Sequence, residues 1–471
     1  MTTGMSVYEQ SIGRRRLLTT TAALAAAAAL PVTPASATPA TPAPGPTPTV
    51  PGDARQADAL RALERAAHPL RSTEPGGRTG DLRALTAMIG DAEVVGLGEA
   101  THGSHEFFTM KERLFRHLVE EKGFTTFALE MSWTAGLRID EYLQGGPGDA
   151  RRIAEEELGG SPWEREEFAG LISWMRHHND RHRDRGHGRR PAGRTVRFMG
   201  NDIGAPRLGD AAFDRVLSHV RASHPADLAR LEDLYARLRP LDDVFAHLRT
   251  PLAERRRAAV AAQQAHDLLG AHGQIGGDAC AWAEQHARNI AQTFAFASLD
   301  LSDPRSVSDA EHLRDRAMAD NTAWWHRRTG DRMLLSAHNG HVGYLSTDPV
   351  MYPTTQGAFL RGALGRRYTA IGFTFAQGSF LTAGSFGGAW GEVTVPAATP
   401  DMQEYTLDRV RHRDYYLDLR TLPAAARSWL EVPRPVHDAG SSFRTPLPTL
   451  AISRAYDVLI HLHRVRAATP L

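Results

Sequence analysis

The stretch that decides the fold is residues 92–130, AEVVGLGEATHGSHEFFTMKERLFRHLVEEKGFTTFALE. It begins with a short, mostly apolar run that predicts a buried strand, and apolar side chains then recur at helical spacing from Glu106 to Glu120. Gly123 ends this helix, and residues 124–130 form a second apolar run typical of a strand. A strand, a helix and a strand in this order form a βαβ unit, which is the element of a parallel sheet.

The rest of the chain repeats this alternation, except in one long segment. Further strands are predicted at residues 195–199, 332–337, 368–375 and 456–460. Residues 206–305 alternate Leu and Ala with Arg and Glu and show no strand pattern, so an all-helical insertion is expected there. The predicted fold class is therefore α/β, a central, mostly parallel sheet flanked by helices, with an all-helical insertion subdomain. In this division, residues 53–205 and 306–471 form the α/β catalytic part.

The N-terminus has the pattern of an export signal. Arginines at residues 14–16 precede an apolar run at 19–30, and small residues follow at 35–37. We therefore interpret residues 1–37 as a twin-arginine-type signal peptide and the Pro-rich residues 38–52 as a linker. The apolar run is too short to remain as a membrane anchor, so the mature protein is expected outside the cell or in the cell envelope.

Composition removes several classes of function. The chain has 471 residues, 42% of them hydrophobic, and a formal net charge of +1. This charge balance argues against a protein that binds nucleic acid or an anionic membrane surface. The single cysteine, Cys280, has no partner for a disulfide or a cysteine metal site and is expected to be a small buried residue. Residues 179–190 are rich in His and Arg and are interpreted as a solvated loop.

Polar side chains follow three of the predicted strands. In open α/β sheets, ligands bind just beyond the carboxyl ends of the strands. The first strand is followed by Glu99 and His102, the second ends in Glu130, and a later one leads into His338-Asn-Gly-His341. A carboxylate beside a histidine orients the ring, fixes its tautomer and raises its basicity, so that the imidazole can take a proton from water. The sequence therefore predicts acid-base chemistry at this edge of the sheet.

Structural explanations remain open for the same residues. Glu99 and His102 are also suited to capping the following helix, and Glu130 is suited to a salt bridge with Lys111 or an arginine. His341 is suited to starting a helix without a further role. Two familiar motifs are missing from the sequence, since there is no Gly-x-Ser-x-Gly nucleophile elbow and no third glycine for a dinucleotide fingerprint.

In these residues the chain resembles the erythromycin esterase family, over most of the mature sequence. The resemblance rests on ordered motifs at Val95–Gly103, Gly123–Phe124, Ala128–Glu130, Trp174–Arg176, Arg314–Met318 with Asn321, and Ala337–His341. It implies a central sheet flanked by helices, a helical subdomain and, as in the characterised resistance members, esterase activity on macrolide lactones. Many members have other or unknown substrates, so antibiotic resistance does not follow from the resemblance.

The resemblance also implies roles for single residues. The essential histidine of the family matches His102, and its two acidic residues match Glu99 and Glu130. Its later histidine pair matches His338 and His341. A basic residue of the family, often arginine, falls at Lys111. This departure leaves the role of Lys111 open, because a flexible ammonium does not reproduce the bidentate contacts of a guanidinium.

The leading hypothesis is hydrolysis of an ester or lactone without a covalent intermediate. His102, oriented by Glu99, would deprotonate a water molecule, with Glu130 and His338 as further catalytic residues. One of the two later histidines would stabilise the oxyanion or protonate the leaving alcohol. The residues assigned to substrate binding or to support of these groups are His341, Asn339 and Lys111. The expected partner is a small-molecule ester or lactone, and the oligomeric state is left open.

Two other hypotheses differ in their chemistry. In the first, a divalent metal, Zn²⁺ or Mn²⁺, is bound by Glu99, His102, Glu130, His338 and His341 and acidifies a bound water. Such a metallohydrolase would act on cell-envelope or glycan esters. In the second, the chain is a non-catalytic binding protein of the cell envelope that has kept the fold. The leading hypothesis itself requires no cofactor.

Overall fold

A computed structural model of the chain describes residues 51–471, except 186–193, 240, 272–276, 384–388 and 444. The predicted signal peptide and residues 38–50 of the predicted linker lie outside this part, and residues 51–52 begin the first helix. No helix in the described part of the chain is long and apolar enough to cross a membrane.

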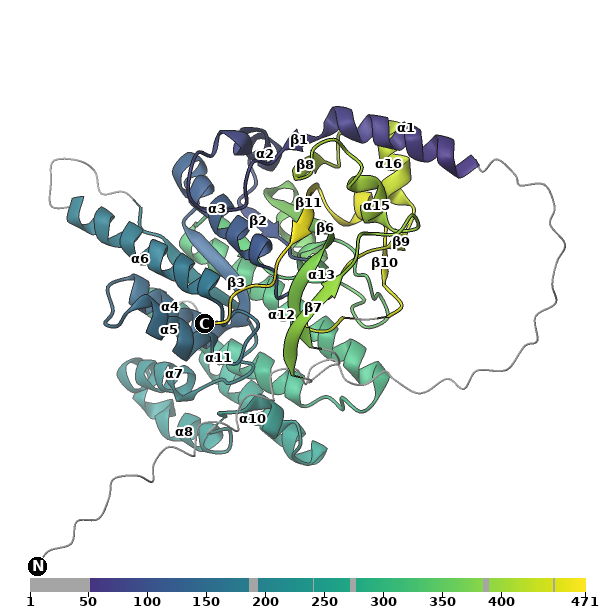
Figure 1. Cartoon of the computed structure of the whole chain (residues 1–471). Helices are drawn as coiled ribbons and strands as arrows, with labels where there is room; N and C mark the ends of the chain where they lie inside the picture. The colour runs from purple at the N-terminus through teal and green to yellow at the C-terminus, as the bar shows by residue number, and fades with distance from the viewer. Residues whose placement is uncertain (1–50, 186–193, 240, 272–276, 384–388, 444) are drawn as a thin grey trace, which may run out of the picture.

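A nine-stranded sheet forms the centre of the molecule (Figure 1). Its strands are β1 (His68–Pro69), β2 (Val94–Leu97), β3 (Thr126–Ser132), β4 (Arg197–Asp202), β5 (Met333–Ser336), β6 (Tyr368–Ala383), β7 (Trp390–Val395), β8 (Tyr415–Asp418) and β11 (Val458–Val465). Their order is β1-β8-β11-β6-β2-β5-β3-β4, with β7 paired to β6. The pairings from β11 to β4 are parallel, which confirms the predicted mostly parallel sheet, whereas β1, β7 and β8 pair antiparallel. A separate small sheet joins β9 (Arg434–Pro435) and β10 (Thr449–Leu450).

Helices cover both faces of this sheet. The α-helices of the described part are α1 (Pro51–Ala66), α2 (Arg83–Ile89), α3 (His105–Lys122), α4 (Trp133–Leu143), α5 (Ala150–Leu158), α6 (Glu166–Arg185), α7 (Asp210–Ser223), α8 (Leu228–Ala236), α9 (Val244–His247), α10 (Leu252–Gly270), α11 (Gly277–Ala297), α12 (Pro304–Thr329), α13 (Asn339–Val342), α14 (Gln356–Leu364), α15 (Gln403–Leu407), α16 (Ala424–Glu431) and α17 (Ile452–Ala455). Val95 and Leu97 belong to the apolar core that contains α3, whereas Val94 belongs to the core that contains α1, α12 and α14. Because β2 is buried on both faces, its sequence is continuously apolar.

The order of the central strands brings distant parts of the chain together. β5 lies between β2 and β3 and pairs in parallel with both, so the βαβ unit of residues 92–130 does not join neighbouring strands. The carboxyl ends of parallel strands lie at one edge of a sheet. The segments that follow residues 97, 132 and 336 therefore meet at this edge.

A helical part of the chain packs beside the end of β4. The described residues of 206–305 contain helices and no strand, and Phe213 and Ile290 belong to an apolar cluster formed among these helices. In Figure 1, α7, α8, α10 and α11 lie together below the sheet. Asn289 of α11 donates a hydrogen bond of 3.0 Å to the backbone carbonyl of Asp202, the last residue of β4. This contact ties the helical part to the edge of the sheet where the strands end.

Helix α6 extends farther than the sequence pattern indicates. The interpretation of residues 179–190 as a solvated loop is wrong for residues 179–185, which continue α6, while the remainder lies outside the described part. Asn179 is buried and donates hydrogen bonds to the carbonyls of Leu143 and Val196, at 3.1 and 2.8 Å. These contacts reach residues distant in the chain, and a local pattern of His and Arg carries no sign of them.

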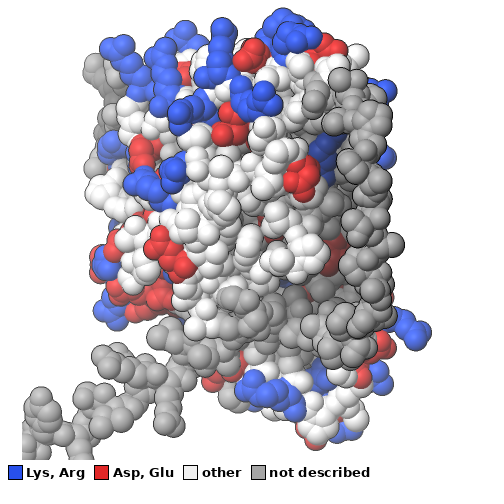
Figure 2. Space-filling view, turned by 45° about the vertical axis from the view of Figure 1, so that its right-hand side comes forward, with Lys and Arg blue, Asp and Glu red and all other residues white. Residues whose placement is uncertain are grey.

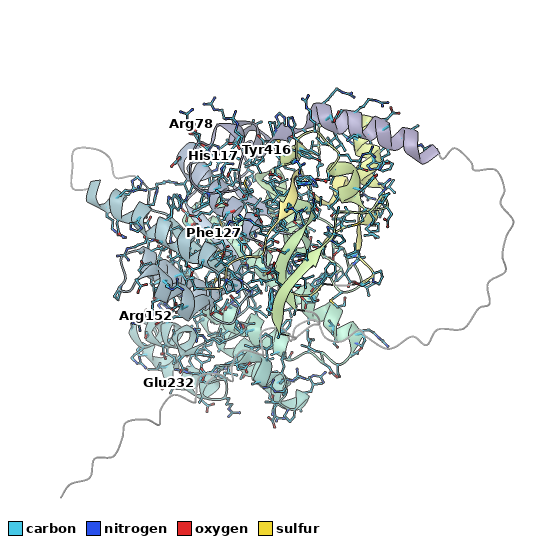
Figure 3. The ribbon with its side chains drawn as sticks, in the orientation of Figure 1. Arg78, His117, Phe127, Arg152, Glu232 and Tyr416 are labelled. Atoms are coloured by element: carbon cyan, nitrogen blue, oxygen red, sulfur yellow. The ribbon has the colours of Figure 1, made fainter. Side chains whose placement is uncertain are left out.

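The interior is mainly apolar, and most charged side chains lie at the periphery. Figure 3 shows Phe127 of β3 in the middle of the molecule and Arg152 and Glu232 near its edge. Cys280 is buried in α11, as expected. On the face shown in Figure 2, Lys and Arg gather along the upper rim, Asp and Glu are scattered, and the middle is largely uncharged. Acidic and basic side chains are thus mixed on this face and do not form one continuous basic surface.

The substitution Gly136→Ala tests the close packing of α4 on β4. A Cβ at Gly136 would clash with the backbone nitrogen of Gly200 and lie 2.6 Å from its Cα. Since backbone atoms cannot move aside as a flexible side chain can, we expect a loss of about 1–3 kcal/mol in the free energy of unfolding, measured by urea denaturation. Gly362→Ala, in α14 with open space around it, is the control and should gain about 0.5–1 kcal/mol. Equal stabilities of the two variants would contradict this packing.

A pH-dependent contact at the start of α3 makes a second prediction. His105 contacts Glu167 through Nδ1 at 2.6 Å and Glu74 through Nε2 at 3.0 Å, and the hydrogen bond with Glu167 raises the pKa of His105 to about 9. A raised folded-state pKa stabilises the protein fully below the unfolded-state value near 6.5, and this stability is lost as the pH rises through 9. We expect His105→Gln to lower the free energy of unfolding by about 1–3 kcal/mol at pH 6 and by much less at pH 10.

Urea denaturation at the two pH values measures this effect. His177→Gln, on the exposed face of α6, is the matched control and should change the free energy of unfolding little at either pH. A pH-independent difference between wild type and His105→Gln would show that the charge of His105 does not stabilise the fold.

Candidate functional site

A cavity opens at the carboxyl edge of the sheet. Its volume is about 370 Å³, and His102, Glu130, His338 and His341 are among its lining residues. His102 follows β2, Glu130 lies in β3, and the two later histidines follow β5. Because β5 lies between β2 and β3, residues from three separate parts of the sequence share one space.

Glu99 contacts His102 and Lys111 through its two carboxylate oxygens. Oε1 of Glu99 lies 2.6 Å from Nδ1 of His102, and Oε2 accepts a hydrogen bond from the Lys111 ammonium on α3. Lys111 also donates to the carbonyl of Ala337, at 3.5 Å, so it links the segment after β2 to the segment after β5. Neither Glu99 nor His102 caps α3, because the residue before that helix is Ser104 and no side chain caps it.

Burial and the neighbouring charge shift the pKa values of Glu99 and Lys111 in opposite directions. Burial raises the pKa of Glu99, but the Lys111 ammonium and the hydrogen bond with His102 more than offset it and leave the pKa below its usual value. Burial also lowers the pKa of Lys111, and Glu99 only partly restores it. The lowered pKa favours the ionised form of Glu99, whose Oε1 lies where it can accept a hydrogen bond from Nδ1 of His102.

Glu130 accepts hydrogen bonds at both carboxylate oxygens. Oε1 accepts from Nη2 of Arg314 at 2.9 Å and lies 3.3 Å from Nε2 of His341. Oε2 accepts from the backbone N–H of His338, at 2.9 Å. Burial raises the pKa of Glu130, but His341, His102 and Arg314 together hold it well below its usual range. The salt-bridge partner of Glu130 is therefore Arg314, while Lys111 pairs with Glu99.

The two later histidines also face carboxylates. Nδ1 of His341 lies 2.9 Å from Oδ1 of Asp315. Burial lowers the pKa of His341, but Glu130 and Asp315 raise it more, so this pKa lies well above its usual value. His338 precedes α13, and its Nδ1 accepts from the N–H of Gly340 at 3.1 Å. Nε2 of His338 lies 3.0 Å from Oδ1 of Asp438, and this carboxylate raises the pKa of His338 against the effect of burial.

Two residues assigned to substrate binding or support lie away from the cavity lining. Asn339 is buried, donates from Nδ2 to the carbonyl of Phe373 at 2.8 Å and accepts from its N–H at 3.0 Å, so it links α13 to β6. A Cβ at Gly98 would clash with Oδ1 of Asn339, which explains the glycine after β2. Lys111 is fully buried behind Glu99.

Sequence reasoning missed several groups of this site. Arg314 donates to Asp202 through Nε at 2.9 Å, as well as to Glu130, and Asp315 is the next residue on α12. Asp202 ends β4, so its place at a strand end was a signal that a polar residue there belongs to the site. Arg314 and Asp315 lie within one of the motifs of the family resemblance. Asp438 lies in an irregular segment, and no local pattern marks it.

The polar groups do not fit a divalent metal in this arrangement. Among the described residues, no three His, Cys, Asp or Glu side chains lie together in a way that could hold a metal ion. The carboxylate of Glu99 is shared by His102 and an ammonium, and the carboxylate of Glu130 is bound by a guanidinium. A Zn²⁺ or Mn²⁺ ion bound to these oxygens would have to displace two buried cations.

Known proteins resemble this chain over most of its length. The sequence model of the erythromycin esterase family matches residues 119–465, which include Glu130, Arg314 and the two later histidines but not Glu99 or His102. Erythromycin esterase type II of Escherichia coli is 24% identical over 355 residues, covering 66% of this chain and 75% of that protein.

Solved structures share the fold. The crystal structure of a protein from Bacillus cereus has a TM-score of 0.78 and 26% identity and covers 88% of this chain and 99% of that one. A mutant of the erythromycin esterase EreC in its open conformation has a TM-score of 0.63 and 17% identity, over 83% of this chain and 96% of that one. With the family match extending over most of the sequence, the chain belongs to the erythromycin esterase family.

Proposed function

We propose that this chain hydrolyses a carboxylic ester or lactone with a water molecule activated by His102. The observation that carries the proposal is the contact of 2.6 Å between Oε1 of Glu99 and Nδ1 of His102, at the wall of the cavity. With Nδ1 engaged by a carboxylate, Nε2 is the nitrogen that accepts the proton of the attacking water. Family membership, which supports a hydrolase, agrees with this chemistry.

Two basic side chains that can stabilise the transition state line the same cavity as His102. Attack of water on the carbonyl carbon places negative charge on the carbonyl oxygen, and preorganised donors in a water-poor cavity stabilise it. Arg314 and His341 line the cavity. Burial lowers the pKa of each, but the nearby carboxylates raise it more, so both pKa values lie above their usual range. We assign the oxyanion to this side of the cavity. Glu99 stabilises the imidazolium that forms at His102.

We extend the proposal to the place where the enzyme acts. Residues 1–37 have the pattern of a twin-arginine signal, which exports proteins already folded. The substrate is then a small ester or lactone that the enzyme meets outside the cytoplasm. Macrolides, other lactones and acylated glycans fit this description equally, and the cavity must be tested against all three.

The variant His102→Asn tests the assignment of the base. Asn cannot accept a proton, so we expect kcat/KM to fall by about 10²–10⁴ on every ester that the wild type hydrolyses, with an unchanged unfolding transition. Mass spectrometry of products from a macrolide, a lactone and an acylated glycan measures the effect. His312→Asn, on the exposed face of α12, is the control and should retain wild-type turnover. Wild-type activity of His102→Asn would exclude this mechanism.

Metal removal tests a second part of the proposal, that water activation here needs no divalent ion. Because Lys111 and Arg314 already neutralise Glu99 and Glu130, we expect elemental analysis of the purified protein to find no stoichiometric zinc or manganese. Turnover should be unchanged after exhaustive dialysis against EDTA. Activity that is lost on chelation and restored by Zn²⁺ or Mn²⁺ would contradict this part and favour a metallohydrolase.

A further inference from the structure

One buried carboxylate in the cavity has no role in the steps derived above. Glu311 lies on α12, one turn before Arg314, is 1% exposed and lines the cavity. Its Oε2 has no hydrogen-bond partner among the described residues, and the nearest cation that it pairs with is Nη1 of Arg314, at 3.8 Å. In contrast, both oxygens of Glu99 and both oxygens of Glu130 are bound.

The surroundings of Glu311 favour its protonated form. The charged groups that face it are Arg314 and Asp315 on its own helix, His341 after β5 and Asp202 at the end of β4. Burial raises the pKa of Glu311 to about 7, although Arg314 and His341 oppose the rise. With a pKa near neutrality Glu311 can hold a proton at neutral pH, whereas the pKa values of Glu99 and Glu130 lie below their usual range. Carboxyl groups with pKa values driven apart in this way divide the roles of acid and base.

The histidines around the cavity already face carboxylates. The ring nitrogens of His341 face Asp315 at 2.9 Å and Glu130 at 3.3 Å. Nδ1 of His338 receives the N–H of Gly340 and has no proton to give there, and its Nε2 faces Asp438 at 3.0 Å. A guanidinium does not release a proton in the range in which proteins work.

We propose that Glu311 is the general acid that protonates the leaving oxygen of the ester. This inference rests on the proposed function and assigns the donor in its second proton transfer. His102 takes a proton from water as the new C–O bond forms and the carbonyl π electrons move to oxygen. When the tetrahedral intermediate collapses, the bond from carbon to the leaving oxygen breaks with its electron pair on that oxygen, which takes the proton of Glu311. The proton on His102 then returns through solvent to Glu311, and the acid product ionises.

A leaving-group series tests this assignment. Departure of an alkoxide needs a proton, whereas 4-nitrophenolate is a far weaker base and departs without one. We therefore compare Glu311→Gln with wild type on the ethyl and 4-nitrophenyl esters of the same acids, butyric and phenylacetic. We expect kcat/KM to fall by about 10²–10⁴ on the ethyl esters and by less than about 5-fold on the nitrophenyl esters. On ethyl esters, the fall of wild-type activity above pH 7 should disappear in the variant.

Two further variants separate the possible outcomes. Asp320→Asn, an exposed carboxylate of the same helix, is the control and should match wild type on both esters. Glu311→Asp, which keeps an acid, should recover part of the ethyl ester activity. An equal loss on both esters, or no loss on either, overturns the assignment of Glu311. His102→Asn should lose both esters alike, so full activity of that variant would overturn the proposed base while leaving the test of Glu311 valid.

Discussion

Glu99 carries a negative charge with no access to solvent, and the rest of the site depends on how that charge is balanced. An unpaired buried carboxylate costs several kcal/mol. His102 and Lys111 offset this cost at separate oxygens of the carboxylate. Lys111 comes from α3 and also contacts the carbonyl of Ala337 after β5. The groups that neutralise one buried charge thereby link the segments after two neighbouring strands and contact the ring of His102.

From this pair, charges of opposite sign alternate through the site. Glu130 binds Arg314, Arg314 also binds Asp202, and His341 lies between Glu130 and Asp315. Each group has at least one partner of opposite charge. These side chains can therefore stay ionised in the interior, where an unpaired group would become neutral. Such groups titrate together, so the pH-rate profile of the wild type reports the set, and only comparison with a variant assigns part of the profile to one residue.

Parts of this molecule follow from local sequence patterns. Apolar runs predicted strands at β2, β3, β5 and β6, because strands buried on both faces leave a continuous apolar signature. The polar residues after those runs, such as Glu99 and His102, could be identified as candidates for chemistry because strand ends collect ligands. The same argument identified Glu130 and the run from His338 to His341, and the family motifs matched these residues. These inferences need only the residues within one segment.

Other features were decided by the tertiary structure alone. β5 inserts between β2 and β3 through pairings between residues more than two hundred positions apart, and no local period encodes that choice. The partners of each charge follow from it: Lys111 binds Glu99, and Arg314 binds Glu130. Glu311 lies in the cavity with an Oε2 that has no hydrogen-bond partner among the described residues. The sequence thus determined which residue types stand at the strand ends. The fold decided which of them are paired, because pairing depends on distances of a few ångströms that long-range packing sets.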